Sequence, residues 1–290
     1  MGGGSWTTSS FTSYCSTTRG IDASNISLDG TITAALNVQD VYKARHLDPI
    51  LSPMNVMREC RDSEEHPNTI PVILALDVTG SMGDAATEVA KKLNVVMTKL
   101  YDQIADVEFC VMGIGDLAYD NSPIQISQFE SDIRIAEQMD KVYFEFGGGC
   151  NSYESYTSAW YMGARHTDLD CWKRGKKGII ITMGDERMNP YLPHRPLKDA
   201  TGDGVQADVD TTELYKEVCE KFDVYHLDVR HGWRHDDGIA PSWSELLDKQ
   251  HFKEVTLDSI ADTIVDIIVG ASDNAVENTT TTNSNGEICW

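Results

Sequence analysis

Two hydrophobic patterns alternate along the chain, and together they predict the fold class. Short, continuous apolar runs such as residues 70–76 are typical of strands that are buried on both faces of a parallel sheet. Apolar residues at helical spacing follow this run, from residue 86 to residue 100. Strands that alternate with helices predict an α/β fold with a doubly wound, mostly parallel sheet and helices on both faces.

The same patterns place the remaining elements and divide the chain. Strands are expected at residues 107–114, 124–129, 178–182, 224–227 and 252–256, and helices at residues 132–140, 154–166, 211–222 and 258–271. Residues 67–271 have the size of one domain, and the polar residues 272–290 are expected to form a flexible tail. Residues 1–66 are an N-terminal extension that could wrap the domain, add strands to the sheet edge, or be disordered over its first twenty residues.

The strand at residues 70–76 ends in a cluster of oxygen-bearing side chains. Asp77 closes the strand, and Thr79 and Ser81 follow on the turn before the next helix. The carboxyl ends of parallel strands form the ligand-binding edge of doubly wound sheets. Hard oxygen donors at this spacing suit Mg²⁺ or Mn²⁺, so the sequence predicts a cation site at this edge.

Asp77, Thr79 and Ser81 resemble the Asp-x-Ser-x-Ser signature of the von Willebrand factor A (VWA) domain, with Thr79 in place of the first serine. The order of elements agrees with that family over residues 71–271. The resemblance implies a VWA, Rossmann-like fold with a metal-ion-dependent adhesion site (MIDAS), in which the two hydroxyls touch the cation and Asp77 holds it through water. The chain is most similar to microbial cytosolic members related to the VWA domains beside alpha-kinases.

The resemblance also implies ligands from two further loops. The glycine loop at residues 147–149 resembles a Gly-Gly-Gly-Asp loop, with Asn151 near the usual Asp or Thr, and Ser152 and Cys150 stay open as alternatives. The third loop follows the strand at residues 178–182, where Asp185 is displaced from the family's usual position. The predicted metal ligands are therefore Asp77, Thr79, Ser81, Asn151 and Asp185. Asp116 is a second-rank candidate, and Glu145 and Glu154 flank the glycine loop.

Charge and composition exclude several classes of partner. The formal net charge of -22 disfavours nucleic acid and anionic membranes, because both would be repelled. The chain has no apolar run near the roughly 20 residues of a transmembrane helix, and its polar N-terminus has no signal-peptide core. The seven cysteines form no CxxC pair and are expected to be reduced. A cytoplasmic location is therefore expected.

The predicted function is non-enzymatic, metal-dependent protein–protein interaction. A partner's Asp or Glu carboxylate would fill the open position on the cation. The family resemblance implies a partner such as an AAA+ ATPase or another multi-protein assembly.

Two alternatives use the same residues differently. A Mg²⁺-dependent phosphohydrolase of the haloacid dehalogenase type would use Asp77 as nucleophile and would hold the phosphate with Thr182 and Lys177. That mechanism needs an acid two residues after the nucleophile, and Thr79 occupies this position. In a metal-free scaffold, Thr79 and Ser81 would only cap the following helix.

Two other groups of residues are considered as sites. The His and Asp residues between 226 and 237 lack a zinc-ligand spacing, so a second metal site there is not favoured. Trp160 and Tyr161 are expected in the core, whereas Trp233 and Trp243 are candidate partner contacts because they lie in a predicted loop.

Overall fold

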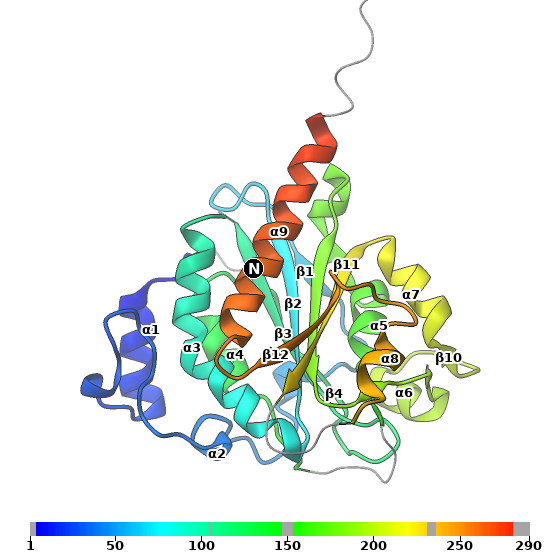
Figure 1. Cartoon of the computed structure of the whole chain (residues 1–290), viewed down its shortest axis with the longest axis horizontal. Helices are drawn as coiled ribbons and strands as arrows, with labels where there is room; N and C mark the ends of the chain where they lie inside the picture. Colours follow the sequence, from blue (N-terminus) through cyan, green and yellow to red (C-terminus); the bar gives the residue numbers. More distant parts are fainter. Residues whose placement is uncertain (1–3, 105, 147–152, 231–235, 281–290) are drawn as a thin grey trace, which may run out of the picture.

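A central six-stranded sheet separates two layers of helices in the computed structural model, which describes residues 4–104, 106–146, 153–230 and 236–280 (Figure 1). The strand order is β12-β11-β7-β2-β3-β4. These strands are β2 (Ile70–Asp77), β3 (Val107–Ile114), β4 (Ile124–Ile126), β7 (Gly178–Gly184), β11 (Phe222–Arg230) and β12 (Phe252–Thr256). Every neighbouring pair is parallel except β3 and β4, so the predicted α/β, mostly parallel sheet is confirmed.

The helices and the small sheets surround this core sheet. The helices are α1 (Thr8–Tyr14), α2 (Val38–Val41), α3 (Gly83–Tyr101), α4 (Arg134–Met139), α5 (Ser158–Arg165), α6 (His194–Thr201), α7 (Thr211–Cys219), α8 (Ile239–Trp243) and α9 (Ile260–Thr280). The short strands pair as β1 (Arg58–Cys60) with β6 (Thr167–Leu169), β9 (Tyr191–Leu192) with β10 (Val209–Asp210), and β5 (Tyr153–Glu154) with β8 (Arg187–Met188).

Each face of the sheet has its own hydrophobic core. In β2, Leu74 and Leu76 belong to the cluster beneath α3 and α9, whereas Ile73 and Ala75 belong to the cluster beneath α5 and α7. Side chains of a strand alternate between faces, so a strand that is apolar at every position supplies both cores. This explains why the sequence of β2 shows no alternation.

The observed boundaries follow the predictions closely in the strands and less closely in the helices. β3 and β12 have the predicted bounds, and β2 includes one residue more, Asp77. The helix expected from residue 154 begins only at Ser158, because Tyr153 and Glu154 pair with β8 instead. The last helix was expected to end near residue 271 but continues to Thr280, so part of the predicted tail is helical.

The N-terminal extension wraps the helical layer around α3. The indole of Trp6 donates a hydrogen bond to Asn94 Oδ1 at 2.8 Å, and Phe11 is fully buried. Arg19 forms a buried ion pair with Asp140, next to α4. Among the described residues, the extension supplies only β1, which pairs with β6 outside the main sheet. The described part of the extension therefore packs against the layer of α3 and α4 and adds no strand to the main sheet.

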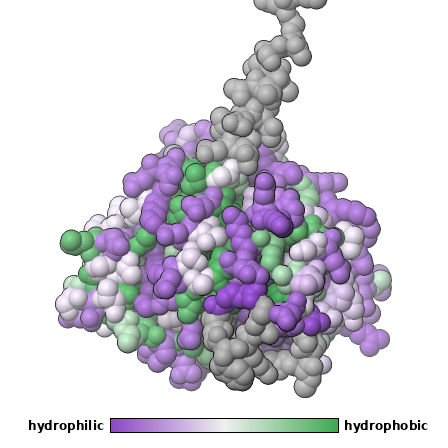
Figure 2. Space-filling view, viewed as in Figure 1, coloured by the Kyte–Doolittle hydropathy of each residue, from purple (hydrophilic) through white to green (hydrophobic). Residues whose placement is uncertain are grey.

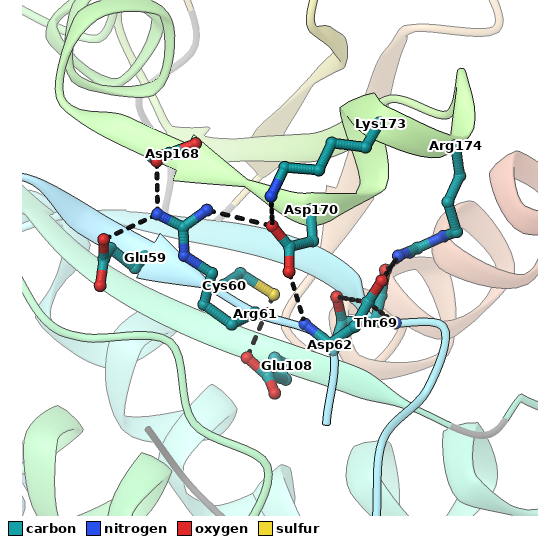
Figure 3. A network of polar contacts seen from close by, with 10 residues as sticks. All are labelled: Glu59, Cys60, Arg61, Asp62, Thr69, Glu108, Asp168, Asp170, Lys173 and Arg174. Atoms are coloured by element: carbon teal, nitrogen blue, oxygen red, sulfur yellow. Dashed lines mark hydrogen bonds and ion pairs between the residues drawn. The ribbon is translucent and has the colours of Figure 1, made fainter. Parts of the chain in front are cut away.

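A network of polar contacts joins β1 and β6 at the amino-terminal side of the sheet, opposite the edge where Asp77 lies (Figure 3). Arg61 contacts three carboxylates in this network, those of Glu59, Asp168 and Asp170. Nearby, the thiol of Cys60 donates a hydrogen bond to Glu108 Oε2 at 3.1 Å. These contacts are consistent with a structural role, because each charged group is paired within the network.

The surface agrees with the acidic composition of the chain. The face visible in Figure 2 is largely hydrophilic, with hydrophobic side chains in small, separate areas. Within the part of the chain that the structure describes, no helix has both the length and the apolar character that crossing a membrane would require.

Candidate metal centre

Asp77, Thr79 and Ser81 converge where β2 ends and the chain turns toward α3. Asp77 is 1% exposed, and its Oδ1 accepts hydrogen bonds from the Thr79 backbone nitrogen at 2.8 Å and from Thr79 Oγ1 at 2.6 Å. The oxygens Thr79 Oγ1 and Ser81 Oγ lie 3.3 Å apart. The turn therefore presents two hydroxyl oxygens beside one buried carboxylate.

The third predicted loop reaches the same place. β7 lies next to β2 in the sheet, and Asp185 directly follows its last residue. Ser81 Oγ donates a hydrogen bond to Asp185 Oδ1 at 3.0 Å. Four of the five predicted ligands, Asp77, Thr79, Ser81 and Asp185, thus lie together. The fifth, Asn151, belongs to residues 147–152 and lies outside the described residues, as do Cys150 and Ser152.

The hydroxyls of this turn do not cap α3. The residues that precede the short helical turn Gly80–Met82 and helix α3 make no side-chain cap hydrogen bond. Instead, Thr79 Oγ1 donates to Asp77, and Ser81 Oγ donates to Asp185. A hydroxyl that donates its only proton still has lone pairs to offer a cation. This arrangement does not fit the metal-free alternative, in which both hydroxyls were expected to act as helix caps.

Electrostatics at the site favour a bound positive charge. Burial of the carboxyl, together with the nearby charge of Asp185, raises the pKa of Asp77 to about 7. A carboxylate held in a buried position next to another acid is stabilised by a proton or by a cation. Oxygen donors of this kind are those that Mg²⁺ and Mn²⁺ take in proteins, so the residues present fit such an ion.

Glu154 adds a further acid at the same edge of the sheet. Glu154 is 6% exposed, and its Oε2 has no hydrogen-bond partner among the described residues. Burial raises the pKa of Glu154 to about 10, and the charges of Asp77, Asp116, Asp120 and Glu186 add to the increase. The sequence identified Glu154 only as a rim residue of the glycine loop, because its apparent helical position concealed strand β5.

A buried aromatic group supports the site from the other side. The Tyr156 hydroxyl donates to Asp77 Oδ2 at 2.7 Å, and the rings of Tyr156 and Trp243 lie 5.7 Å apart. Trp243 also stacks on His226, with ring centroids 3.6 Å apart. Its indole nitrogen donates a hydrogen bond to the Glu186 backbone oxygen at 3.2 Å. The prediction that Trp243 contacts a partner is therefore wrong, because this residue is fully buried and packs beneath the third loop. Trp233 lies outside the described residues.

The remaining candidate ligands have local roles in the structure. Asp116 follows β3 and accepts a hydrogen bond from the Ala118 backbone nitrogen at 2.7 Å, which stabilises its own loop. His226 is fully buried, and burial lowers its pKa well below the usual value, so the ring is neutral. Among the described residues, no three His, Cys, Asp or Glu side chains are placed to hold a metal together. The candidate centre is of a different kind, because two of its proposed ligands are the hydroxyl oxygens of Thr79 and Ser81 rather than His, Cys, Asp or Glu side chains.

The phosphohydrolase alternative requires a basic residue that the structure places elsewhere. Lys177 directly precedes β7, at the end of that strand opposite to Asp185, and its ammonium lies 3.4 Å from Asp223. Thr182 is fully buried and contacts His226 Nδ1 at 2.8 Å. Neither side chain is placed to hold a phosphate at Asp77, so the geometry does not support this alternative.

Comparison with known proteins gives distant structural similarity only. No model of a known protein family matches the sequence, and no curated protein matches it. The pilus adhesin SpaC from Lactobacillus rhamnosus GG aligns at 13% identity and a TM-score of 0.49, over 73% of this chain. The alignment covers 31% of the adhesin, so this chain corresponds to less than a third of that protein's length.

Two smaller proteins align over almost their whole length. The vWF domain of the type V pili tip protein Mfa5 from Porphyromonas gingivalis aligns at 12% identity and a TM-score of 0.39, covering 76% of this chain and 98% of that domain. The conserved hypothetical protein BatB from Bacteroides thetaiotaomicron aligns at 14% identity and a TM-score of 0.43, covering 70% of this chain and 99% of BatB. The functional argument therefore depends on the residues of this chain.

Proposed function

We propose that this chain is a VWA-type interaction module that binds a partner's carboxylate through a divalent cation, Mg²⁺ or Mn²⁺. One observation supports the proposal above the others. Thr79 Oγ1 and Ser81 Oγ lie side by side, and each donates its proton to a carboxylate, the first to Asp77 and the second to Asp185. The oxygens of both hydroxyls can therefore face a cation, while the two carboxylates supply the negative charge that attracts it.

The roles of the residues follow from their burial. In this proposal, Thr79 and Ser81 provide direct oxygen ligands, and Asp77 and Asp185 provide charge in or just outside the coordination shell. Asn151 of the glycine loop is the fifth proposed ligand. Asp77 is fixed by three hydrogen bonds, from the Thr79 backbone, the Thr79 hydroxyl and Tyr156. When bound, the cation supplies a positive centre that accepts one more oxygen ligand. Ser81 is exposed, so a partner's Asp or Glu can approach from that side.

The proposed setting is a reducing compartment, and the proposed partner is a protein. Cys60 is a buried thiol that donates a hydrogen bond to Glu108, a contact that only reduced cysteine can make. This supports a cytoplasmic location. The formal charge of -22 supports a protein partner over nucleic acid. An AAA+ ATPase or another multi-protein assembly is the kind of partner that the family resemblance suggests.

Calorimetric titration with Mg²⁺ and Mn²⁺ tests the cation site. We expect saturable binding to the wild type and a loss of affinity of roughly tenfold or more in Ser81→Ala. Ser244→Ala is the matched control, because Ser244 is an exposed serine at the end of α8. Absence of binding to the wild type, or equal binding to Ser81→Ala, would contradict the proposed site.

A second measurement tests the open ligand position. Water-proton relaxation of the Mn²⁺-loaded protein reports water bound to the ion, and we expect acetate to reduce the enhancement whereas neutral acetamide does not. Retention of Mn²⁺ without any acetate effect would make the cation structural and would overturn the adhesion role.

A further inference from the structure

The carboxylate of Glu154 is unusual among the acids at this edge of the sheet. Asp77 receives three hydrogen bonds although it is buried. Glu154 is also more than nine-tenths buried, yet within the described part of the chain its Oε2 accepts no hydrogen bond and the residue forms no ion pair. A buried charge without a partner is strongly destabilising. At neutral pH the folded protein therefore compensates this carboxyl group either with a bound proton or with a cation.

The backbone holds Glu154 firmly beside the candidate centre. On one side, β5 pairs with β8, and Glu154 is opposite Met188 in the register. On the other side, the next residue, Ser155, accepts a hydrogen bond from the Leu117 backbone nitrogen at 2.9 Å and donates one to the Gly115 backbone oxygen at 3.3 Å. The backbone of Glu154 is thus held by contacts on both sides.

The neighbours of Glu154 make its surroundings strongly negative. The carboxylates within electrostatic range come from the ends of three strands: Asp77 is the last residue of β2, Asp116 and Asp120 follow β3, and Glu186 follows β7. Because β2, β3 and β7 are parallel, these three strand ends lie at the same edge of the sheet. A positive ion near Asp77 would therefore relieve repulsion from several directions at once.

We infer that Glu154, the last residue of β5, is a further cation-binding residue of the centre. This inference rests on the proposed function and identifies a residue of the same site. In this inference Glu154 lies outside the first coordination shell and acts through a water on the ion. Cation affinity rises with the number of negative charges around the ion, and Glu154 adds a third to those of Asp77 and Asp185.

Glu145 provides a matched control for Glu154. Both residues flank the glycine loop, but both carboxylate oxygens of Glu145 lie near the Asn121 backbone nitrogen, at 3.1 Å and 2.8 Å. The carboxylate of Glu145 therefore already has a partner within the loop. The substitution Glu→Gln removes the charge with almost no change of shape at either position.

Two measurements test the inference: Mg²⁺ affinity is expected to fall, and the melting temperature of the metal-free protein is expected to rise. We expect Glu154→Gln to weaken Mg²⁺ binding roughly tenfold in calorimetric titration, whereas Glu145→Gln stays near wild type. The melting temperature of metal-free Glu154→Gln should rise above that of the wild type at neutral pH, because the buried amide, unlike the buried carboxyl group, needs no bound proton to become neutral. A purely structural Glu154 would leave Mg²⁺ affinity unchanged.

The outcomes separate this inference from the proposed function. Normal Mg²⁺ affinity in folded Glu154→Gln overturns the role of Glu154 and leaves the proposed centre intact. Absence of Mg²⁺ binding to the wild type overturns both. If Glu154→Gln does not fold, Glu154→Asp keeps the charge and shortens the side chain, and wild-type affinity in that variant would also count against a carboxylate that must reach the ion's water.

Discussion

The hydroxyl of Tyr156 donates a hydrogen bond to Asp77 Oδ2 at 2.7 Å, and both side chains are almost completely buried. This contact connects the segment before α5 to the end of β2. It also occupies the carboxylate oxygen that Thr79 does not contact, since Thr79 bonds to Oδ1. The orientation of Asp77 is therefore set before a cation binds.

Removal of this hydroxyl should weaken both folding and cation binding. A hydrogen bond to a charged group contributes about 1.5 to 3 kcal/mol, so we expect Tyr156→Phe to lower the free energy of unfolding of the metal-free protein by roughly that amount in urea titrations. Mg²⁺ affinity should fall as well, because Asp77 loses its fixed orientation. Tyr119→Phe is the control, since Tyr119 is 56% exposed on a neighbouring loop. Unchanged affinity in Tyr156→Phe would show that this contact does not position the ligand.

Gly184 is required by the position of the same tyrosine. A Cβ atom at Gly184 would lie 2.1 Å from the Tyr156 hydroxyl oxygen and 2.3 Å from its ring, closer than atoms can pack. Tyr156 has no room to move because it is fully buried beside Trp243 and His226. We expect Gly184→Ala to cost about 1 to 3 kcal/mol or more in urea unfolding.

The control for this substitution is Gly204→Ala, because nothing lies within 4 Å of a Cβ built at Gly204. That variant should stay within about 0.5 kcal/mol of the wild type. Equal stability of the two variants would mean that Tyr156 can leave its position, and the preorganised geometry of Asp77 would then be in doubt.

Glu108 should give the stability of the protein a distinct pH dependence. Burial raises the pKa of Glu108 above its ordinary value, with Cys60 as its hydrogen-bond donor (Figure 3). A carboxyl with a raised folded-state pKa stabilises the fold below its unfolded pKa of about 4.3, and this contribution disappears as the pH rises through the folded-state pKa. Glu108→Gln should therefore flatten the decrease in unfolding free energy above about pH 4.3.

Urea titrations of wild type and variant across that pH range measure the effect. Glu213→Gln is the control, because Glu213 is a surface acid paired with Lys216. A Glu108→Gln curve parallel to the wild type at every pH would show that Glu108 does not titrate in this range.

Local pattern was sufficient to predict the sheet, and the resemblance to the VWA signature selected the residues that meet at its edge. The apolar runs of β2 and β3 could only be strands buried on both faces, and the parallel order then brought Asp77 and Asp185 to one edge. Asp185 was selected as the acid of the family's third loop, and the structure places it beside Ser81 because its strand, β7, lies next to β2. These are consequences of strand direction, which the order of elements determines.

Long-range contacts explain what the sequence could not show. The sequence pattern around Glu154 predicted a helix, but Glu154 lies in a strand and pairs with Met188. Hydrophobic periodicity within one segment cannot show pairing with a residue far away in the sequence. Trp243 lies in a short helix between strands, where exposure was expected, and it is buried because it stacks on His226 at 3.6 Å. No sequence motif indicates the role of Tyr156, because that role is a single hydrogen bond to Asp77.

The N-terminal extension should contribute strongly to stability through one ion pair. Arg19 Nε and Nη2 contact the two carboxylate oxygens of Asp140 at 2.9 Å and 2.6 Å, and the Arg19 side chain is 2% exposed. Asp140→Asn leaves the buried guanidinium without its counter-charge, so we expect a loss of roughly 3 to 5 kcal/mol in urea unfolding, with faster proteolysis of the extension. Asp262→Asn is the control, because its pair with Lys99 is largely exposed and should contribute less than about 1 kcal/mol. Similar losses in the two variants would mean that the extension adds little to the stability of the domain.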